Sequence, residues 1–358
     1  MIEGAGMKRT WCAAGMMALL ATLAGAAPLV AQDRVPGAAI RDRIKSRMEL
    51  RRSVRIPPLG TATRLPGGGP GYESVLIQGQ ARTFLRYTPN SVLVAARRVP
   101  VVFALHGARG TADRLQGYLG LNAVADREGF IVVYPQGLEN IWNDGRKAKV
   151  KVKGAKPAGD VDDVAFLNGL ADALVAQGIA DPARLYLTGI SNGGFMTLRL
   201  ACEGTTRFAA FATVIASLPL TARSTCKPAR PLPLVMINGT SDSLVRYDGG
   251  AGRLGISGNA APLEAAAFMA GLNGCASVTD IAMPARDAAD PTSVTRRVWN
   301  GCKPGGGVEF YTVKGGGHQA PVIGAASSGV VLEMFLGTRS HQIDTAETMW
   351  DFFKRAGQ

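Results

Sequence analysis

A serine held between two glycines, in the sequence Gly-Ile-Ser-Asn-Gly at positions 189–193, has the setting that most favours covalent chemistry in this chain. The apolar run 184–188 precedes it, and the helix-like run 195–201 follows it. A sharp turn from a strand into a helix exposes a serine hydroxyl at the edge of a sheet, so this context predicts a nucleophile elbow at Ser191. A serine hydroxyl is a poor nucleophile until a base accepts its proton, so a base and an acid must be found elsewhere.

Three histidines are candidates for the general base, and their positions differ. His318 follows the apolar run 308–313 and the flexible stretch 314–317, so a loop can carry its imidazole to the end of a strand. His341 lies in a stretch typical of a surface turn and is the reserve candidate. His106 precedes the serine in the chain, and we expect it to brace its own loop. His318 is therefore the predicted base.

Asp242 is the candidate acid that would orient the histidine. It follows the apolar run 233–238 and a Gly-Thr-Ser turn, so it also leaves the carboxyl end of a strand. Asp248 is its competitor, but it stands beside two glycines, where a turn-forming aspartate needs no catalytic explanation. The order serine, aspartate, histidine along the chain is that of an α/β-hydrolase and differs from the chymotrypsin and subtilisin orders.

Acyl transfer also requires backbone donors for the negative charge that develops on the substrate oxygen. The amide after the nucleophile, that of Asn192, is the first expected donor. The second is expected from the loop after the buried strand 101–105, where glycines allow amides to face a ligand. We predict Ala108 as this donor and its neighbour Arg109 as a substrate-binding residue.

These residues require strands that deliver them to one edge of a sheet. Apolar runs that alternate with helix-like segments predict strands at 74–78, 83–88, 101–105, 130–134, 185–188, 210–215, 234–238 and 309–313. Continuous apolar strands are typical of a mostly parallel central sheet with helices on both faces. We therefore predict the α/β class and an α/β-hydrolase fold, with the site at the carboxyl ends of the strands.

The chain of 358 residues divides into three predicted parts. Residues 1–31 have a basic start, an apolar core at 16–23 and small residues before position 32, which indicates a secretory signal peptide. Residues 32–71 form a basic amphipathic segment and a Pro- and Gly-rich linker, and residues 72–358 form one catalytic domain. We therefore expect the mature protein to be secreted or periplasmic.

The formal net charge of +13 is partly concentrated at positions 33–55, which contain eight basic and three acidic residues. Apolar residues repeat there at helical spacing, so this stretch is either a solvated helix ahead of the domain or an element that makes weak contacts with anionic surfaces. A second basic run, 146–153, is either a rim of the active site or a charged surface hairpin. No feature of the sequence indicates nucleic-acid recognition.

Eight motifs are spread from about Tyr72 to the end of the chain. They are Leu105-His-Gly107, Tyr134-Pro-Gln-Gly137, Trp142-Asn143, Asp160-Val-Asp-Asp-Val-Ala-Phe166, Gly189-Ile-Ser-Asn-Gly-Gly-Phe-Met196, Asn238-Gly-Thr-Ser-Asp242, Gly316-Gly-His-Gln-Ala-Pro321 and Trp350-Asp-Phe-Phe353. Together they give the chain a resemblance to the secreted esterases of the polyhydroxybutyrate depolymerase family, which are close to the feruloyl and acetylxylan esterases of carbohydrate esterase family 1.

The resemblance implies that the catalytic triad of the family falls on the three residues predicted above, and it places Trp142 near the substrate cleft as a second substrate-binding residue. Where the family often has Trp-Pro after the histidine, this chain has Gln319-Ala320-Pro321, so we expect one aromatic wall of the cleft to be missing. Asp163 matches an acidic residue of the family, and an interaction with the dipole of its helix is a sufficient explanation for it.

Four cysteines remain when Cys12 is removed with the signal segment. An even number in an oxidising compartment indicates two disulfides, for which three pairings exist. We expect Cys202 to pair with Cys226, since one ends the helix after the elbow and the other lies in the next loop, and Cys275 to pair with Cys302 around one insertion. The absence of any Cys-x-x-Cys sequence argues against a zinc site, and we expect no metal or other cofactor.

The expected activity is that of a secreted serine esterase acting through an acyl-enzyme on short hydroxyalkanoate esters or oligomers of the polyhydroxybutyrate type. We expect soluble esters because no Thr- or Ser-rich linker or polymer-binding domain follows positions 350–353. Hydrolysis of feruloyl or acetylxylan esters of plant cell wall is the alternative within the same enzyme class. A non-catalytic binding protein on a hydrolase scaffold is the alternative from another class.

Overall fold

The structure of the protein, a computed structural model, describes residues 71–93, 97–146, 161–204, 206–252, 258–324 and 330–356. The predicted signal peptide, the basic segment and most of the basic run after position 146 lie outside these residues. The signal peptide, the amphipathic segment and the boundary at residue 72 therefore stay predictions.

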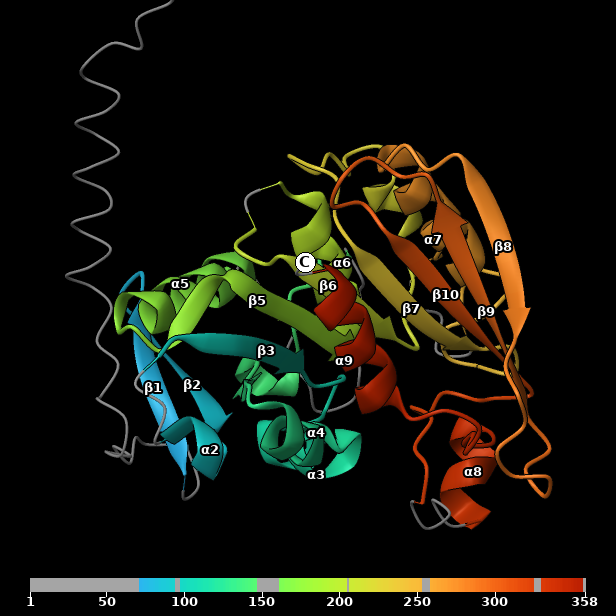
Figure 1. The fold of residues 1–358 in the computed structure, drawn as a ribbon, viewed down its shortest axis with the longest axis horizontal. Helices are drawn as coiled ribbons and strands as arrows, with labels where there is room; N and C mark the ends of the chain where they lie inside the picture. Colours follow the sequence, from blue (N-terminus) through green and yellow to red (C-terminus); the bar gives the residue numbers. More distant parts are fainter. Residues whose placement is uncertain are drawn as a thin grey trace, which may run out of the picture. The chain divides into compact units, whose positions relative to one another are not determined.

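One ten-stranded sheet, with the strand order β1-β2-β4-β3-β5-β6-β7-β10-β9-β8, runs through the described part of the chain (Figure 1). Its strands are β1 (Tyr72–Ile77), β2 (Gln80–Tyr87), β3 (Val99–Leu105), β4 (Ile131–Pro135), β5 (Ala180–Ile190), β6 (Ala210–Val214), β7 (Leu234–Gly239), β8 (Ser277–Ala282), β9 (Ser293–Asn300) and β10 (Val308–Lys314). Strands β4, β3, β5, β6, β7 and β10 pair in parallel, and the other strands pair antiparallel. The prediction of an α/β fold with a mostly parallel sheet is confirmed.

Strands β8 and β9 were not predicted, although all eight predicted strands are present. They lie in the insertion between Cys275 and Cys302 and extend the sheet beyond β10 as an antiparallel ribbon. All six residues of β8 are exposed, so its sequence has neither a continuous apolar run nor a regular alternation. Both expected disulfides, Cys202–Cys226 and Cys275–Cys302, are present in the structure.

Helices cover both faces of the sheet and form two separate apolar cores with it (Figure 1). On one face lie α5 (Asp163–Ala176), α6 (Asn192–Cys202) and α7 (Pro262–Leu272), and on the other lie α3 (Ala112–Leu119), α4 (Leu121–Glu128) and α9 (Thr345–Ala356). The short helices are α2 (Asn90–Leu93), η1 (Leu138–Asn140), η2 (Leu220–Ala222) and α8 (Val330–Leu336). Among the residues described, no helix is long and apolar enough to cross a membrane.

Burial on both faces explains the composition of the central strands. Every residue of β4, β6 and β7 is buried, so these strands are almost continuously apolar. Parallel pairing brings Leu105 opposite Gly189 and Val313 opposite Gly239, at the carboxyl ends of β3, β5, β10 and β7. The loops that follow these four strands therefore emerge at the same edge of the sheet, where the predicted site residues lie.

Candidate active site

Ser191 occupies a strained turn between β5 and α6. Its backbone angles are φ 49° and ψ −119°, a conformation that a residue with a side chain rarely adopts and that costs about 1–3 kcal/mol. The turn is held on both sides, since the Ser191 N–H donates to Val214 O and its carbonyl accepts from the Phe195 N–H, each at 3.0 Å. This strand, strained serine and helix sequence is the geometry of a nucleophile elbow.

Two glycines of the elbow have no room for a side chain. A Cβ at Gly189 would overlap the backbone of Gly193, and a Cβ at Gly193 would overlap the carbonyl oxygens of Leu105 and His106. The elbow therefore packs directly against the end of β3. This close approach explains why glycine stands at both positions around the serine.

His318 joins Ser191 to Asp242 through two hydrogen bonds. Its Nε2 lies 2.9 Å from Ser191 Oγ, and its Nδ1 lies 2.7 Å from Asp242 Oδ2. Asp242 Oδ1 accepts the N–H groups of Leu244 and Val245, both at 2.8 Å, so the carboxylate is fixed in orientation. With the proton on Nδ1, the imidazole can donate to Asp242 and accept the serine proton at Nε2.

The two reserve candidates lie outside this chain of hydrogen bonds. His341 has its Nδ1 2.8 Å from Val322 O, and its N–H donates to Asp290. Asp248 is exposed on the turn before Gly249, and Asp242 occupies the carboxylate position beside His318. The described residues contain no group of three or more His, Cys, Asp or Glu side chains that could hold a metal ion.

The loop after β3 lies against the elbow, because a Cβ at Gly107 would be 3.5 Å from Ser191 Cβ. Within the described part of the chain, the amides of Ala108 and Asn192 have no hydrogen-bond acceptor. Asn192 is the first residue of α6, where an amide has no partner within the helix. Two amides without acceptors beside the serine can stabilise an oxyanion. Arg109 is exposed, with a positive φ of 63°, and its contact with substrate stays a prediction.

His106 is a buried, neutral brace of this loop. It is 1% exposed, and burial lowers its pKa to about 4. Its Nδ1 lies 2.8 Å from Gly107 O, and its Nε2 accepts the Gly137 N–H at 3.0 Å. A histidine that is uncharged at neutral pH and bonded at both nitrogens holds its loop in place without a proton to transfer.

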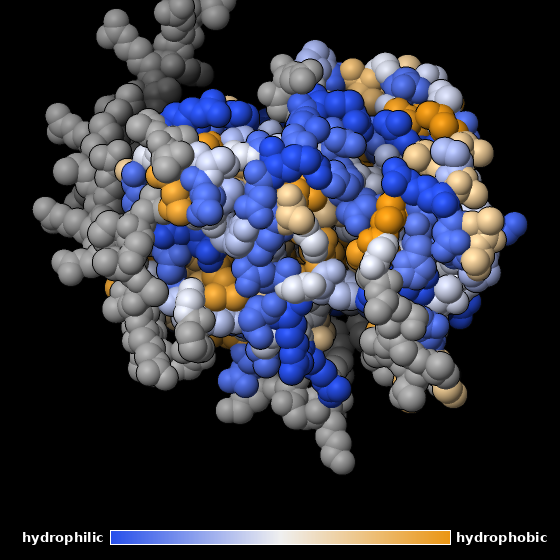
Figure 2. Space-filling view, turned by 60° about the horizontal axis from the view of Figure 1, so that its bottom comes forward, coloured by the Kyte–Doolittle hydropathy of each residue, from blue (hydrophilic) through white to orange (hydrophobic). Residues whose placement is uncertain are grey.

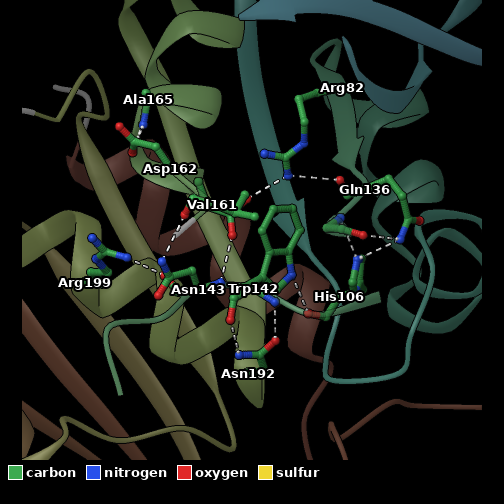
Figure 3. A network of polar contacts seen from close by, with 12 residues as sticks. Arg82, His106, Gln136, Trp142, Asn143, Val161, Asp162, Ala165, Asn192 and Arg199 are labelled. Carbon is green, nitrogen blue, oxygen red and sulfur yellow. Dashed lines mark hydrogen bonds and ion pairs between the residues drawn. The ribbon is translucent and has the colours of Figure 1, made fainter. Parts of the chain in front are cut away.

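Trp142 is buried next to the loops of the site, and its contact with substrate stays a prediction. The side chain is 2% exposed and belongs to an apolar core. Its indole N–H donates to His106 O at 2.9 Å, and its backbone N–H donates to Asn192 Oδ1 at 2.8 Å (Figure 3). Trp142 therefore connects the two loops that carry the amides of Ala108 and Asn192.

Asp163 lies in the first turn of α5, as the expected interaction with the helix dipole requires, and it is also a buried ion-pair partner. It is fully buried, its carboxylate lies 2.7 Å from Arg82, and it accepts the Asn143 N–H at 2.8 Å. The cap of α5 is Asp162, which accepts the Ala165 N–H. Burial lowers the pKa of Arg82, and the nearby Asp163 carboxylate opposes this effect. The partners are 81 residues apart, so nothing local in the sequence indicated the pair.

Asp144 is a second buried carboxylate that was not predicted. It is 7% exposed and accepts a hydrogen bond from Asn192 Nδ2 at 2.6 Å. Asp144 directly follows the Trp142-Asn143 motif, and this was the only indication in the sequence that it lies near the elbow.

Apolar side chains lie on elements that carry or contact the three predicted catalytic residues. Phe195, Ala216 and Val245 form a small cluster separate from the two main cores. On α8, Met334 and Phe335 are 76% and 63% exposed, and the last residue of this helix accepts the His318 N–H. The two residues that follow His318, Gln319 and Ala320, are buried, and the missing aromatic wall of the cleft stays a prediction.

Several proteins of known name are similar to this chain. A putative esterase, NocK, from Nocardia uniformis subsp. tsuyamanensis is 29% identical over 78% of this chain and 80% of its own length. Feruloyl esterase B from Piromyces equi is 26% identical over 62% of this chain, which spans 40% of that protein. Poly(3-hydroxyalkanoate) depolymerase C from Paucimonas lemoignei is 30% identical over 32% of this chain and 27% of its own length.

Two further comparisons concern the fold and the family. The solved structure of an acetyl xylan esterase from Aspergillus awamori has a TM-score of 0.46 and 16% identity, and it covers 67% of this chain and 90% of that chain. The family model for the esterase PHB depolymerases matches residues 83–227, which include the loop after β3, the elbow and α6. Residues 83–227 therefore resemble an esterase PHB depolymerase domain, and the chain is a carboxylic ester hydrolase.

Proposed function

We propose that Ser191 is the nucleophile of this esterase and forms an acyl-enzyme with its substrate. His318 accepts the serine proton as Oγ attacks the ester carbonyl, and Asp242 stabilises the imidazolium that results. The amides of Ala108 and Asn192 stabilise the oxyanion. His318 then protonates the leaving alcohol and activates the water that releases the acid. The observation that carries this proposal is the continuous set of hydrogen bonds from Ser191 Oγ through His318 to Asp242.

Short hydroxyalkanoate esters and their oligomers are the proposed substrates. The exposed apolar side chains of Met334 and Phe335, on the helix whose last residue accepts the His318 N–H, suit aliphatic groups of an ester. On the face in Figure 2, orange apolar areas are separate and surrounded by hydrophilic residues.

The proposed site of action lies outside the cytoplasm. The signal-like segment 1–31 supports export, and the two disulfides are of the kind that persist in oxidising compartments. Export would place the enzyme where extracellular ester oligomers are available.

Hydrolysis by the purified mature protein tests the proposal. We expect Ser191→Ala to fold as the wild type and to lose hydrolysis by roughly 10³-fold or more, since only binding and oxyanion effects remain. A fluorophosphonate should label the wild type at Ser191 and leave the variant unlabelled. Retained turnover in Ser191→Ala would overturn the catalytic assignment, and an inactive, unlabelled wild type would favour a binding protein.

A substrate panel tests the proposed substrate class separately. It should contain p-nitrophenyl esters of increasing acyl length, 3-hydroxybutyrate oligomers, methyl ferulate and acetylated xylan. We expect the highest kcat/KM among short aliphatic esters and the oligomers. A preference for methyl ferulate or acetylated xylan would assign the enzyme to plant cell-wall esters instead, and the triad assignment would still hold.

A further inference from the structure

The side chain of Asn192 is held as firmly as the strained serine beside it. The side chain is 3% exposed, and its oxygen and its nitrogen both have hydrogen-bond partners. Its Oδ1 accepts the Trp142 N–H at 2.8 Å, and its Nδ2 donates to Trp142 O at 3.1 Å and to Asp144 Oδ2 at 2.6 Å. The backbone amide of the same residue is the proposed oxyanion donor, so these contacts fix the direction of that amide.

Asp144 is the charged member of this set. Its Oδ2 also accepts from Nε and Nη2 of Arg146, and its Oδ1 accepts the Arg146 N–H. The two side chains are 6% and 10% exposed, so the ion pair is nearly dry. Hydrogen bonds to an ionised acceptor are shorter and stronger than neutral ones, which makes the contact with Asn192 the most directional of its three.

Arg146 is fixed from its other side by an aromatic ring. Its guanidinium carbon lies 3.7 Å from the centroid of the Phe195 ring. Phe195 lies one turn after Asn192 on α6, so the same helix end carries the ring and the amide. Arg146 therefore places a positive charge between the carboxylate and the start of α6. Without it, the carboxylate would stand unpaired behind an amide that must bind a negative oxygen.

We propose that Asp144 is a positioning residue for ester hydrolysis, holding Asn192 so that its amide faces the oxyanion, and that Arg146 neutralises the charge this requires. The inference rests on the proposed function of Ser191 and of the Asn192 amide. It assigns to the pair an effect on the transition state and not on substrate binding. Losing either partner should therefore lower kcat and leave KM nearly unchanged.

The first test compares two substitutions of Asp144. Asp144→Ala removes the acceptor for Asn192 Nδ2, and we expect kcat to fall about tenfold or more while KM changes little. Asp144→Asn keeps an oxygen acceptor of the same shape, so its loss should be only a few-fold. Wild-type kcat in folded Asp144→Ala would overturn the proposal.

The second test separates charge from packing. Arg146→Met keeps an apolar stem over Phe195 but leaves the Asp144 carboxylate unpaired, so we expect kcat to fall about tenfold. Asp144→Asn combined with Arg146→Met removes both charges and retains the acceptor, so kcat should return to within a few-fold of the wild type. A double variant as slow as Arg146→Met would refute the neutralising role, because a purely structural loss would not be reversed by removing a second partner.

The ion pair of Arg86 with Glu73 is a matched control. It is similarly buried, with side chains 5% and 9% exposed, but it lies between β1 and β2. Arg86→Met should lower the unfolding temperature and leave kcat unchanged, whereas variants of the Asp144 pair should also lose affinity for a boronic acid that forms a tetrahedral adduct with the serine. Equal loss of affinity for the product carboxylate would contradict the proposal.

The same measurements distinguish the proposed role of Ser191 from that of Asp144. If the proposed function is wrong, the wild type has no serine-dependent turnover. If only the role of Asp144 is wrong, wild-type turnover depends on Ser191 but folded Asp144→Ala retains the wild-type kcat.

Discussion

The loops on the serine side of the site are joined by a network of buried side chains, whereas the two loops on the histidine side also meet directly through their backbones. On the serine side, Trp142, Asn192 and His106 connect the elbow to the loop after β3 (Figure 3). Behind them, the Arg82–Asp163 pair holds the same segment through the Asn143 N–H. Each of these contacts depends on the identity of a side chain.

The histidine side also has side-chain contacts, such as those of Thr240 Oγ1 with the Gly315 N–H and of Gln319 Nε2 with Gly337 O, but backbone contacts join its two loops. The amides of Gly317 and His318 donate to Thr338 O and Leu336 O, and the Ser241 amide donates to Gly316 O. A Cβ at Gly239 would overlap the carbonyl oxygens of Gly316 and Gly317, in the loop before His318. The loop of the acid and the loop of the base are thus packed backbone against backbone.

The two sides of the site have to align different groups: backbone amides on the serine side and an imidazole on the histidine side. Amides that stabilise an oxyanion must be aligned before the reaction begins, and a network of buried polar side chains provides that alignment. An imidazole that moves a proton needs a correct tautomer and two partners, which Ser191 and Asp242 supply. Substitutions of single side chains around the site should therefore affect the serine side more than the histidine side, apart from the triad itself.

The largest expected effect comes from the base itself, which is the exception on the histidine side. His318→Ala should reduce kcat/KM by roughly 10³-fold or more, because the serine loses its proton acceptor. His341→Ala, which removes a ring bonded to Val322 O, should stay within a few-fold of the wild type. Steady-state hydrolysis of a short p-nitrophenyl ester measures both, and the opposite result would transfer the role of base to His341.

The acid should give the next largest effect. Asp242→Asn should keep the fold and reduce kcat by at least roughly 10²-fold, because an amide neither holds the correct tautomer nor stabilises the imidazolium. Asp248→Asn should change kcat little, since Asp248 is exposed. Near-wild-type kcat for Asp242→Asn together with a collapse for Asp248→Asn would show that the wrong carboxylate was chosen.

On the serine side, His106 should make stability depend on pH. Its folded pKa of about 4 lies below the unfolded value of 6.5, so between these values the unfolded chain binds more protons. This contribution is complete above pH 6.5 and is lost as the pH falls toward 4, by about 3 kcal/mol in total. Denaturant unfolding of the wild type and of His106→Gln should show a steeper loss for the wild type across this range. Parallel curves would rule out the buried neutral state of His106.

The smallest expected effect tests the connection between the two oxyanion loops. Trp142→Phe keeps the ring in the core but removes the indole N–H that His106 O accepts, so kcat should fall about tenfold with little change in KM. Trp350→Phe, in a buried ring stacked on Phe130, is the control and should lower stability only. If both variants have the wild-type kcat, the side-chain network is not needed for alignment.

The sequence predicted what depends on local pattern. Buried parallel strands leave continuous apolar runs, so all eight predicted strands are present, and the three residues of the proposed triad follow strand ends and are joined by hydrogen bonds. Strand β8 was not predicted because its residues are exposed and, among the described strands, it pairs only with β9. A strand whose composition carries no pattern of burial cannot be found by pattern alone.

The sequence did not indicate the contacts of side chains that meet distant partners. The resemblance placed Trp142 near the cleft, and the structure shows it close to the site but beneath it, bonded to residues 36 and 50 positions away. Asp163 has a partner 81 residues away, and Asp144 contacts a residue 48 positions away. Sequence spacing predicts neighbours along a helix or strand, but it cannot predict which buried donor meets a carboxylate from another element.

The helix after the elbow is anchored at both ends. Its first residue, Asn192, is bonded to Trp142 and Asp144, and its last residue, Cys202, is linked to Cys226 by a disulfide. An eleven-residue helix is about 16 Å long, so the covalent anchor lies that far from the serine. Such a helix can neither slide along its axis nor rotate about it without breaking one anchor. We therefore expect reduction of this disulfide to release the far end of the helix that begins next to the serine.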